Sequence, residues 1–130
     1  FGCRWMLHRP SPSMFTKRAL LLTTAAGGGM RRTLQDLQDS MNFWGVGRVV
    51  RLGRAVHALT WDSVSPATRS RLELDVQKAC RRLRVDRPVK PRLYVRLMFG
   101  FFRRLLPRMN TATDLQYWEA QGWFSGHKPW

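Results

Sequence analysis

An almost wholly apolar stretch of the sequence lies between two prolines, Pro91 and Pro107. Its apolar side chains point to nearly all sides of a helical projection, which predicts a helix over residues 92–106 that is buried almost all round. The chain has 130 residues, and a chain of this length forms one small domain with a thin core. We therefore expect this helix to pack against its own neighbours and against a foreign surface.

Two further segments carry helix-start signals. Thr33 followed by Asp36 resembles a capping box with the shorter acid in third position, and it predicts a helix from residue 33 onward. Ser65 followed by Pro66 predicts an N-cap and the first position of a helix that runs to about residue 84.

A basic segment over residues 46–59 carries Arg48, Arg51 and Arg54 at a spacing of three. With valine and leucine between the arginines, this pattern indicates an amphipathic helix. Its arginines form either a stripe that contacts phosphate or lipid head groups, or a solvated helix face.

No segment shows an alternation that is convincing for a β-strand, so the predicted fold class is all-α. We expect a small helical subunit of three to four helices with an extended N-terminal arm and an aromatic C-terminal tail. The expected organisation is a basic presequence-like arm over residues 1–32, a helical domain over residues 33–107 and an aromatic docking tail over residues 108–130.

The N-terminal arm has the composition of a transit peptide. It is rich in arginine, serine and threonine and has no acidic residue before Asp36. The segment Met14–Met30 joins a basic start to an apolar middle and a glycine run, as mitochondrial presequences do. The alternative interpretation is an ordinary disordered basic arm.

The net charge of +15 comes from 23 basic and 8 acidic residues, and 19 of the basic residues are arginine. Arginine binds phosphate through two parallel hydrogen bonds, so an anionic partner is expected, either RNA or anionic lipid. No apolar run approaches the roughly 20 residues that cross a bilayer. We therefore expect no transmembrane helix.

The residue types that perform catalysis or bind metals are scattered. The three histidines and two cysteines form no set with nucleophile or metal-ligand spacing. We expect no enzyme activity, no catalytic residue, no metal and no cofactor, and with only Cys3 and Cys80 a disulfide framework is not expected.

At its centre the sequence resembles a known family. The segment Ala79 to Leu83 is similar to an alanine followed by x-Arg-Arg-Leu at a helix end, and the apolar helix closing on Leu-Pro follows it. Tyr117, Trp118 and Glu119 are similar to an aromatic acidic tail. The remaining matches lie upstream, at Trp44, Leu59, Asp62 and Val64. Together these motifs resemble the ubiquinone-binding-protein subunit of the mitochondrial cytochrome bc1 complex, or complex III.

This resemblance implies a non-catalytic structural or assembly subunit at the matrix side of the mitochondrial inner membrane. Its partners would be cytochrome b and the core proteins, with an anionic phospholipid such as cardiolipin beside its arginines. The predicted lipid or phosphate contacts are Arg48, Arg51, Arg54, Arg96, Arg103 and Arg104. The predicted subunit interface consists of Arg81, Arg82, Phe99, Phe101, Phe102, Trp118, Trp123, Phe124 and Trp130.

Two alternatives stay open. A mitochondrial ribosomal protein would use the same arginines on rRNA phosphates. An accessory subunit of another respiratory complex or of the ATP synthase would differ from the first prediction only in its partner.

Overall fold

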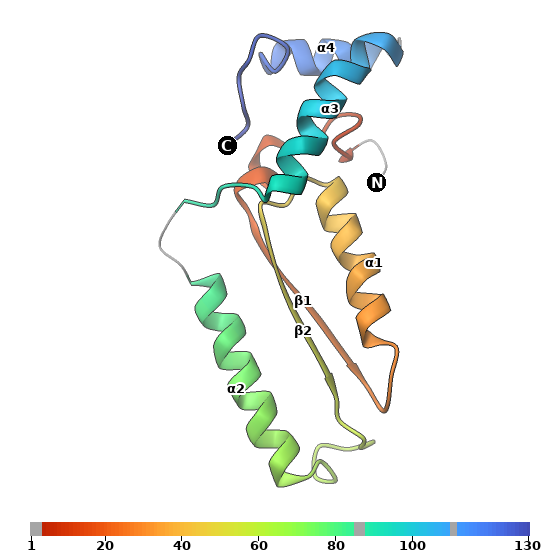
Figure 1. Cartoon of the computed structure of the whole chain (residues 1–130), viewed down its shortest axis with the longest axis vertical. Helices are drawn as coiled ribbons and strands as arrows, with labels where there is room; N and C mark the ends of the chain where they lie inside the picture. The colour runs from red at the N-terminus through yellow and green to blue at the C-terminus, as the bar shows by residue number, and fades with distance from the viewer. Residues whose placement is uncertain (1–3, 85–87, 110–111) are drawn as a thin grey trace. The chain divides into compact units, whose positions relative to one another are not determined.

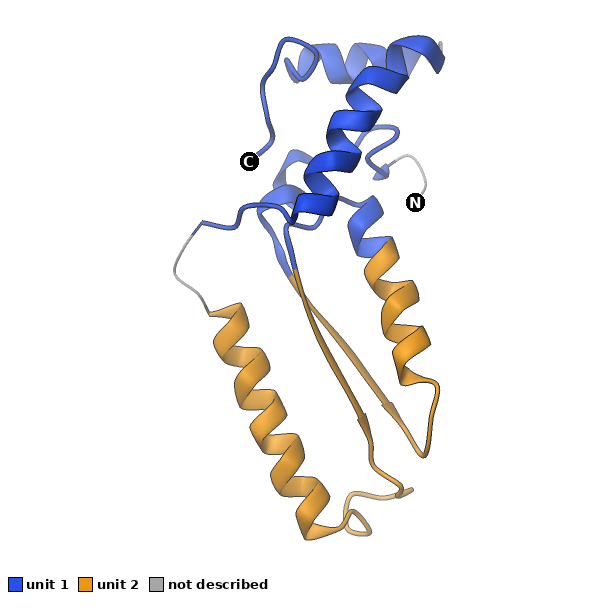
Figure 2. Cartoon of the chain, viewed as in Figure 1, with its two compact units in different colours: residues 1–18, 40–48, 88–130 blue, residues 19–39, 49–87 orange. Residues whose placement is uncertain are grey.

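The computed structural model describes residues 4–84, 88–109 and 112–130. The chain forms two compact units (Figure 2), and each is described by itself. Unit 1 consists of residues 1–18, 40–48 and 88–130, and unit 2 of residues 19–39 and 49–87. In chain order the elements are η2 (Pro12–Thr16), β1 (Arg18–Ala25), α1 (Met30–Phe43), β2 (Arg48–Ala55), α2 (Pro66–Leu83), α3 (Leu93–Met109) and α4 (Ala112–Ala120).

Strands β1 and β2 pair in parallel and are joined through α1 (Figure 1). At one end the Arg48 N–H donates to the Lys17 carbonyl over 3.1 Å, and at the other the Val56 N–H donates to the Ala25 carbonyl over 3.0 Å. Both pairs have the same sequence separation, so the strands run in the same direction without a change of register. Parallel neighbours require a crossover connection, usually a helix, and α1 provides it.

The all-α prediction is wrong, because the fold is mixed α/β. The composition of β1, RALLLTTA, predicts the apolar middle of a presequence. In the structure Leu21 is buried while Leu20 and Leu22 on either side of it are exposed, which is the alternation of a strand. Threonines at its end favour extended backbone over helix.

The segment predicted as a basic amphipathic helix is β2. Its adjacent β-branched residues Val49 and Val50 suit a strand. Along a strand successive side chains point to opposite faces, so Arg51 lies on the face opposite to Arg48 and Arg54. The spacing of three that would align these arginines on a helix therefore separates them here.

Helix α2 follows its sequence signals closely. The Ser65 hydroxyl oxygen accepts a hydrogen bond from the Thr68 N–H at 3.2 Å, and Pro66 occupies the first turn, which confirms the predicted N-cap. Near the other end of α2, Ala79 packs with Val50 and Leu52 of β2 in a small apolar cluster. The helix thereby covers part of one face of the sheet.

Helix α1 begins before the predicted start. Its first residue is Met30. Thr33, the predicted cap, lies within the first turn of the helix, and its hydroxyl donates to the Gly29 carbonyl over 3.4 Å. Leu34 on this helix is buried, and a Cβ on Gly53 of β2 would lie only 2.8 Å from its Cδ1 atom. Glycine at position 53 therefore allows α1 to approach the sheet closely.

Unit 1 has an aromatic core. Its buried members come from the N-terminal segment, from α3 and from the C-terminal residues: Met6, Phe15, Val95, Phe99, Phe102, Leu106, Trp118 and Trp123. The Phe99 and Trp118 rings stack with centroids 4.9 Å apart, and Trp123 meets both edge-on. The tail thus packs against its own chain, and α3 continues past Pro107 to Met109.

The N-terminal segment is fixed by α4. The Trp118 Nε1–H donates to the His8 carbonyl at 2.6 Å, and the Tyr117 hydroxyl donates to the Pro10 carbonyl at 2.8 Å. Buried Asp114 accepts a hydrogen bond from His8 Nδ1 at 2.7 Å and pairs with Arg9 at 3.2 Å. Burial raises the pKa of the Tyr117 phenol. Residues of the predicted extended arm are therefore part of a folded unit.

Replacing Gly47 by alanine tests how tightly this unit is packed. A Cβ at this position would overlap the backbone carbonyl oxygen of Phe15 and lie 2.6 Å from Val89 Cγ1. We expect Gly47→Ala to lower the free energy of unfolding by about 1–3 kcal/mol, measured by denaturant titration. Gly100→Ala is the matched control, because its Cβ meets no atom within 4 Å. In a helix that change should stabilise by about 0.5–1 kcal/mol. Equal effects of the two changes would contradict the packing argument.

Candidate functional site

The carboxyl ends of β1 and β2 meet at one edge of the sheet in unit 2. Figure 1 shows the connection from β1 to α1 and the loop that follows β2 at this same end. The first connection contains Gly27, Gly28 and Gly29, here called the glycine loop. In open parallel α/β sheets, ligands bind beyond the carboxyl ends of the strands. This edge is therefore a candidate ligand site.

The glycine loop is not explained by packing within the described chain. A Cβ on Gly27, Gly28 or Gly29 would meet no atom within 4 Å. Only Gly29 has a positive φ, +86°, that favours glycine by conformation. The absence of side chains here would let a ligand approach the backbone of the loop closely.

The glycine loop leads directly into the N-terminus of α1. The Gly29 carbonyl accepts hydrogen bonds from the N–H groups of Arg32 and Thr33, so Gly29 is the residue that precedes the helix. The N–H groups of Met30 and Arg31 lie in the first turn and have no helical carbonyl to bind. Such groups form a site for an anion, since they point outward at the positive end of the helix dipole.

The charges in the first turn of α1 are the reverse of what a helix favours. This turn contains no acidic residue, whereas Arg31 and Arg32 are both present and exposed. Cations near a helix N-terminus are unfavourable by about 0.3–1 kcal/mol each, because the dipole is positive there. A bound anion at this helix terminus would interact favourably with both the arginines and the positive end of the dipole.

The loop after β2 contains a residue with a positive φ and, farther along, an exposed ring beside α2. His57 has φ +50°, in the left-handed region that few non-glycine residues occupy. Farther along, the Trp61 side chain is 56% exposed, with the Arg69 guanidinium 5.0 Å from the centre of its ring. Trp61 lines a shallow hollow of about 350 Å³ together with Leu72, Glu73, Val76 and Gln77 of α2.

Of the three predicted arginine contacts on β2, Arg51 and Arg54 have partners inside unit 2, and Arg48 belongs to unit 1. Arg54 forms an ion pair with Asp75 of α2, and hydrogen bonding from Arg54 holds the pKa of the Asp75 carboxyl below its usual value. Arg51 donates to the Gln35 side chain of α1 at 3.4 Å. The structure thus uses these two arginines to connect the strand to the flanking helices.

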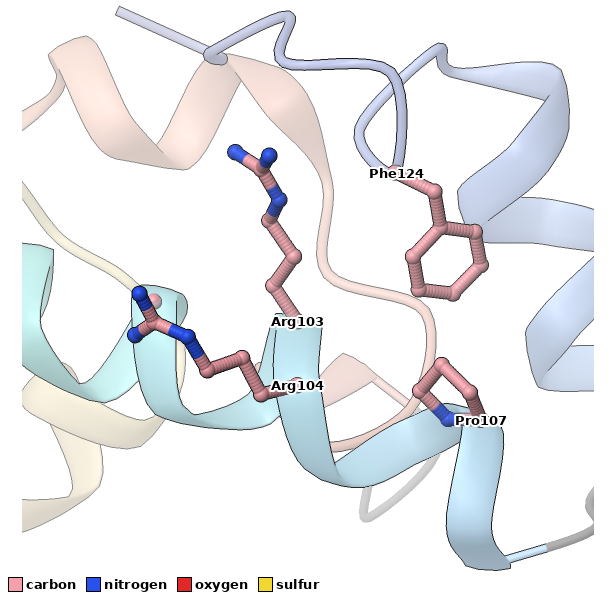
Figure 3. Close-up of a pocket in the computed structure, with 5 residues that line it drawn as sticks. Arg103, Arg104, Pro107 and Phe124 are labelled. Carbon is pink, nitrogen blue, oxygen red and sulfur yellow. The ribbon is translucent and has the colours of Figure 1, made fainter.

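The predicted contacts on α3 lie together in unit 1. Arg103 and Arg104 line a hollow of about 420 Å³ with Gly100, Pro107 and Phe124. Figure 3 shows the Phe124 ring facing Pro107 and the two arginine side chains extending in different directions from the helix. Arg96 and Arg103 line an adjacent hollow of about 230 Å³ that also includes Trp130 and Lys128.

The predicted interface residues separate into buried and exposed sets. Phe99, Phe102, Trp118 and Trp123 are in the unit 1 core, so their burial needs no second protein. Phe124 and Trp130 are half-buried against this core. Phe101 is 55% exposed, and Arg81 and Arg82 are exposed in the last turn of α2. The core set is therefore not available to a partner, whereas the exposed set is.

Residues 4–84, 88–109 and 112–130 are those that the structure describes. These ranges contain no group of three or more His, Cys, Asp or Glu side chains placed to hold a metal ion. They also contain no helix that is both long and apolar enough to cross a membrane.

No protein-family model, curated protein or solved structure matches the chain. The resemblance to the complex III subunit therefore stays a prediction from short motifs. The all-helical fold that it implies is not the fold observed.

Sequence reasoning missed the glycine loop as a site. The signal was present as an apolar segment ending in Thr-Thr-Ala, then a glycine run, then a helical pattern from Leu34. A strand, a glycine-rich turn and a helix in this order are typical of phosphate-binding α/β units. The sequence alone did not distinguish the two interpretations, because a basic start, an apolar middle and a glycine run are also typical of a presequence.

The Arg54–Asp75 pair gives a pH-dependent prediction. Replacing Arg54 by methionine removes the hydrogen bond that lowers the Asp75 pKa, so this pKa should rise toward 3.8. A carboxyl with a lowered folded-state pKa contributes stability above its unfolded pKa and loses it as pH falls through the folded value. The variant should therefore be less stable than the parent near neutral pH, and the difference should shrink as pH falls below 3.8 and disappear below the lowered pKa of Asp75 in the folded parent.

Carboxyl-carbon NMR titration of Asp75 and thermal melts across this pH range would measure both effects. Arg51→Met is the matched control, because Arg51 lies on the other face of β2 and bonds to Gln35. An unchanged Asp75 pKa in Arg54→Met would show that the pair does not persist in solution.

Proposed function

We propose that this chain is a parallel α/β module that binds a phosphate-bearing ligand of the nucleotide class at the carboxyl edge of β1 and β2. The observation that carries the proposal is the glycine loop, which joins β1 directly to the N-terminus of α1 in a β–α–β unit. This arrangement brings unpaired first-turn N–H groups and a positive dipole end to one point. A phosphate group accepts hydrogen bonds from these N–H groups, and its negative charge is favourable at the positive end of the dipole.

Three features of the site support an anionic ligand over a neutral one. The exposed Arg31 and Arg32 follow the glycine loop and place two further positive charges at the helix start. Gly29 has no side chain, so no side-chain oxygen of its own competes for the first-turn N–H groups. The glycines leave space for an oxyanion to approach the backbone.

The loop after β2 supports a ligand with a ring as well as a phosphate. Trp61 offers an exposed aromatic face beside the α2 hollow, and aromatic faces stack on bases and other flat rings. His57 follows shortly after β2 and has a positive φ, and non-glycine residues in this region are concentrated at ligand sites. This proposal replaces the expectation that the chain binds no cofactor, and it assigns no reaction.

The second candidate is the role implied by the sequence resemblance, a non-catalytic assembly subunit of complex III at the matrix side of the inner membrane. One observation favours a role in assembly: α3 exposes Leu97 and Phe101 to solvent. The mixed α/β fold argues against the particular family, which is helical. The ribosomal and ATP synthase alternatives have the same support from exposed arginines and apolar residues.

Nucleotide binding is the direct test of the first proposal. The full chain should bind at least one of ATP, NADH and FMN, measured by calorimetry, with amide NMR shifts at Gly28, Gly29 and Met30. Gly28→Val should weaken that binding by about tenfold or more, equivalent to about 1.4 kcal/mol, because the side chain occupies the phosphate position. Arg31→Gln with Arg32→Gln should weaken it further and reduce its salt dependence.

The Gly28→Val variant is informative because a Cβ at position 28 meets no atom within 4 Å and the φ of Gly28 is not positive. Its melting temperature should equal that of the parent. The control is Gly100→Ala, which changes a glycine in unit 1 and should leave nucleotide affinity unchanged. If none of the three nucleotides or inorganic phosphate shifts these amides, the proposal is wrong.

The second candidate has its own test. Native gel separation of detergent-solubilised mitochondria, with mass spectrometry of each band, should find the chain with cytochrome b if the complex III role is correct. Co-sedimentation with ribosomal RNA would instead support the ribosomal alternative. Migration of the chain apart from every complex would exclude both.

A further inference from the structure

Helix α3 is apolar on two sides. Val95, Phe99 and Phe102 point into the unit 1 core and are nearly inaccessible. On another face, Leu93, Leu97 and Phe101 follow one another at a spacing of four, which aligns them on one side of the helix. These three side chains are 66%, 63% and 55% exposed. They form a continuous solvent-facing row, here called the α3 stripe.

Positive charge accompanies the α3 stripe, beside it and at its C-terminal end. Helix α3 contains no acidic residue, and Arg96, Arg103, Arg104 and Arg108 lie along it. Within the described ranges these arginines form no ion pair. Unit 1 as a whole has twelve basic and two acidic side chains, a net charge of +10. Unit 2 has eleven basic and six acidic side chains. The excess charge is therefore concentrated in the unit that carries the stripe.

The arginines beside the stripe line hollows with aromatic surfaces. Gly100 and Arg103 are common to the 420 Å³ and 230 Å³ hollows, so the two adjoin each other along α3. Phe124 lines the first and Trp130 the second. A Cβ on Gly100 would meet no atom within 4 Å, so the lack of a side chain there keeps this surface open. An anionic group could reach Arg103 with its apolar part against a ring.

We propose that α3 binds the surface of an anionic lipid bilayer, with the α3 stripe among the upper acyl chains and its arginines on lipid phosphates. A helix with an exposed apolar row flanked by arginine is the pattern of helices that lie in the membrane interface. Long arginine side chains reach head groups while their stems stay in apolar surroundings. The proposal concerns unit 1 and does not depend on the ligand site in unit 2.

The exposed row decides between a membrane and a nucleic acid. A nucleic-acid phosphate backbone would match the arginines but would leave Leu93 and Leu97 in water. A bilayer interface matches both, since it offers phosphate and hydrocarbon within one helix diameter. The charge excess favours a membrane over a neutral protein surface, because anionic lipid attracts each nearby arginine.

Vesicle co-sedimentation of the full chain tests the proposal. The chain should bind phosphatidylcholine vesicles that contain phosphatidylglycerol or cardiolipin, and bind pure phosphatidylcholine far more weakly. Leu97→Gln with Phe101→Gln should reduce binding to anionic vesicles by about tenfold or more. Arg104→Gln with Arg108→Gln should reduce binding to anionic vesicles by about fivefold per arginine. Raising the salt concentration should also reduce this binding.

Matched controls come from α2. Leu74→Gln with Val76→Gln changes two exposed apolar residues, and Arg81→Gln with Arg82→Gln changes two exposed arginines, all in unit 2. Neither pair should alter vesicle binding. All the substituted apolar side chains are exposed, so the variants should melt at the parent temperature. Equal binding to neutral vesicles, or equal losses in the α2 controls, would overturn the proposal.

Two other outcomes would also overturn it. Absence of vesicle binding together with a dimer that Leu97→Gln and Phe101→Gln dissociate would assign the α3 stripe to a protein interface. Binding to RNA that depends on Arg104 and Arg108 but not on Leu97 and Phe101 would assign the arginines to nucleic acid.

Discussion

The parallel pairing of β1 and β2 is the constraint on which the rest of unit 2 depends. Two adjacent strands that run in the same direction cannot be joined by a tight turn, so the chain must return along the sheet through α1. The return brings the carboxyl ends of both strands to one edge, where the Val56 N–H still donates to the Ala25 carbonyl. That edge then collects the glycine loop, the start of α1 and the residues after β2. The candidate ligand site is therefore a consequence of strand direction.

The sequence predicted the elements that are specified by local chemistry. Ser65 and Pro66 define the start of α2 through a hydrogen bond and a fixed φ, which neighbouring residues alone determine. The strands could not be predicted in this way, because a parallel strand is stabilised by a partner that lies about thirty residues away in sequence. The segment at Arg48 to Arg54 shows the ambiguity: a spacing of three aligns side chains on a helix and separates them on a strand. Only the pairing partner decides between the two.

The aromatic residues illustrate a similar limit for the predicted interface. A tail rich in tryptophan on a small basic chain is consistent with docking onto another protein, and equally with completing a thin core. In the structure Trp118 and Trp123 complete the core, and the hydrogen bond from Trp118 to the His8 carbonyl joins the two ends of the sequence. Phe101, only two residues from buried Phe99, is exposed because the helix turns it to the other side. Composition identified the aromatic residues as important, but three-dimensional packing decided which of them remain available.

The role of each arginine likewise depends on whether a carboxylate of the chain pairs with it. The excess of arginine is a property of the whole chain, yet its arginines are in different physical states. Arg54 is compensated by Asp75 and binds a strand to a helix, so its charge is largely used within unit 2. Arg104 and Arg108 lie with an exposed apolar row on a helix without any carboxylate, where an external anion would relieve the mutual repulsion of like charges. Arg31 and Arg32 lie at the positive end of the dipole of their own helix, where a bound anion would also be favourable. The two surfaces differ in what accompanies the charge: backbone N–H groups at α1 suit a small phosphate, and exposed leucine and phenylalanine on α3 suit an anionic bilayer.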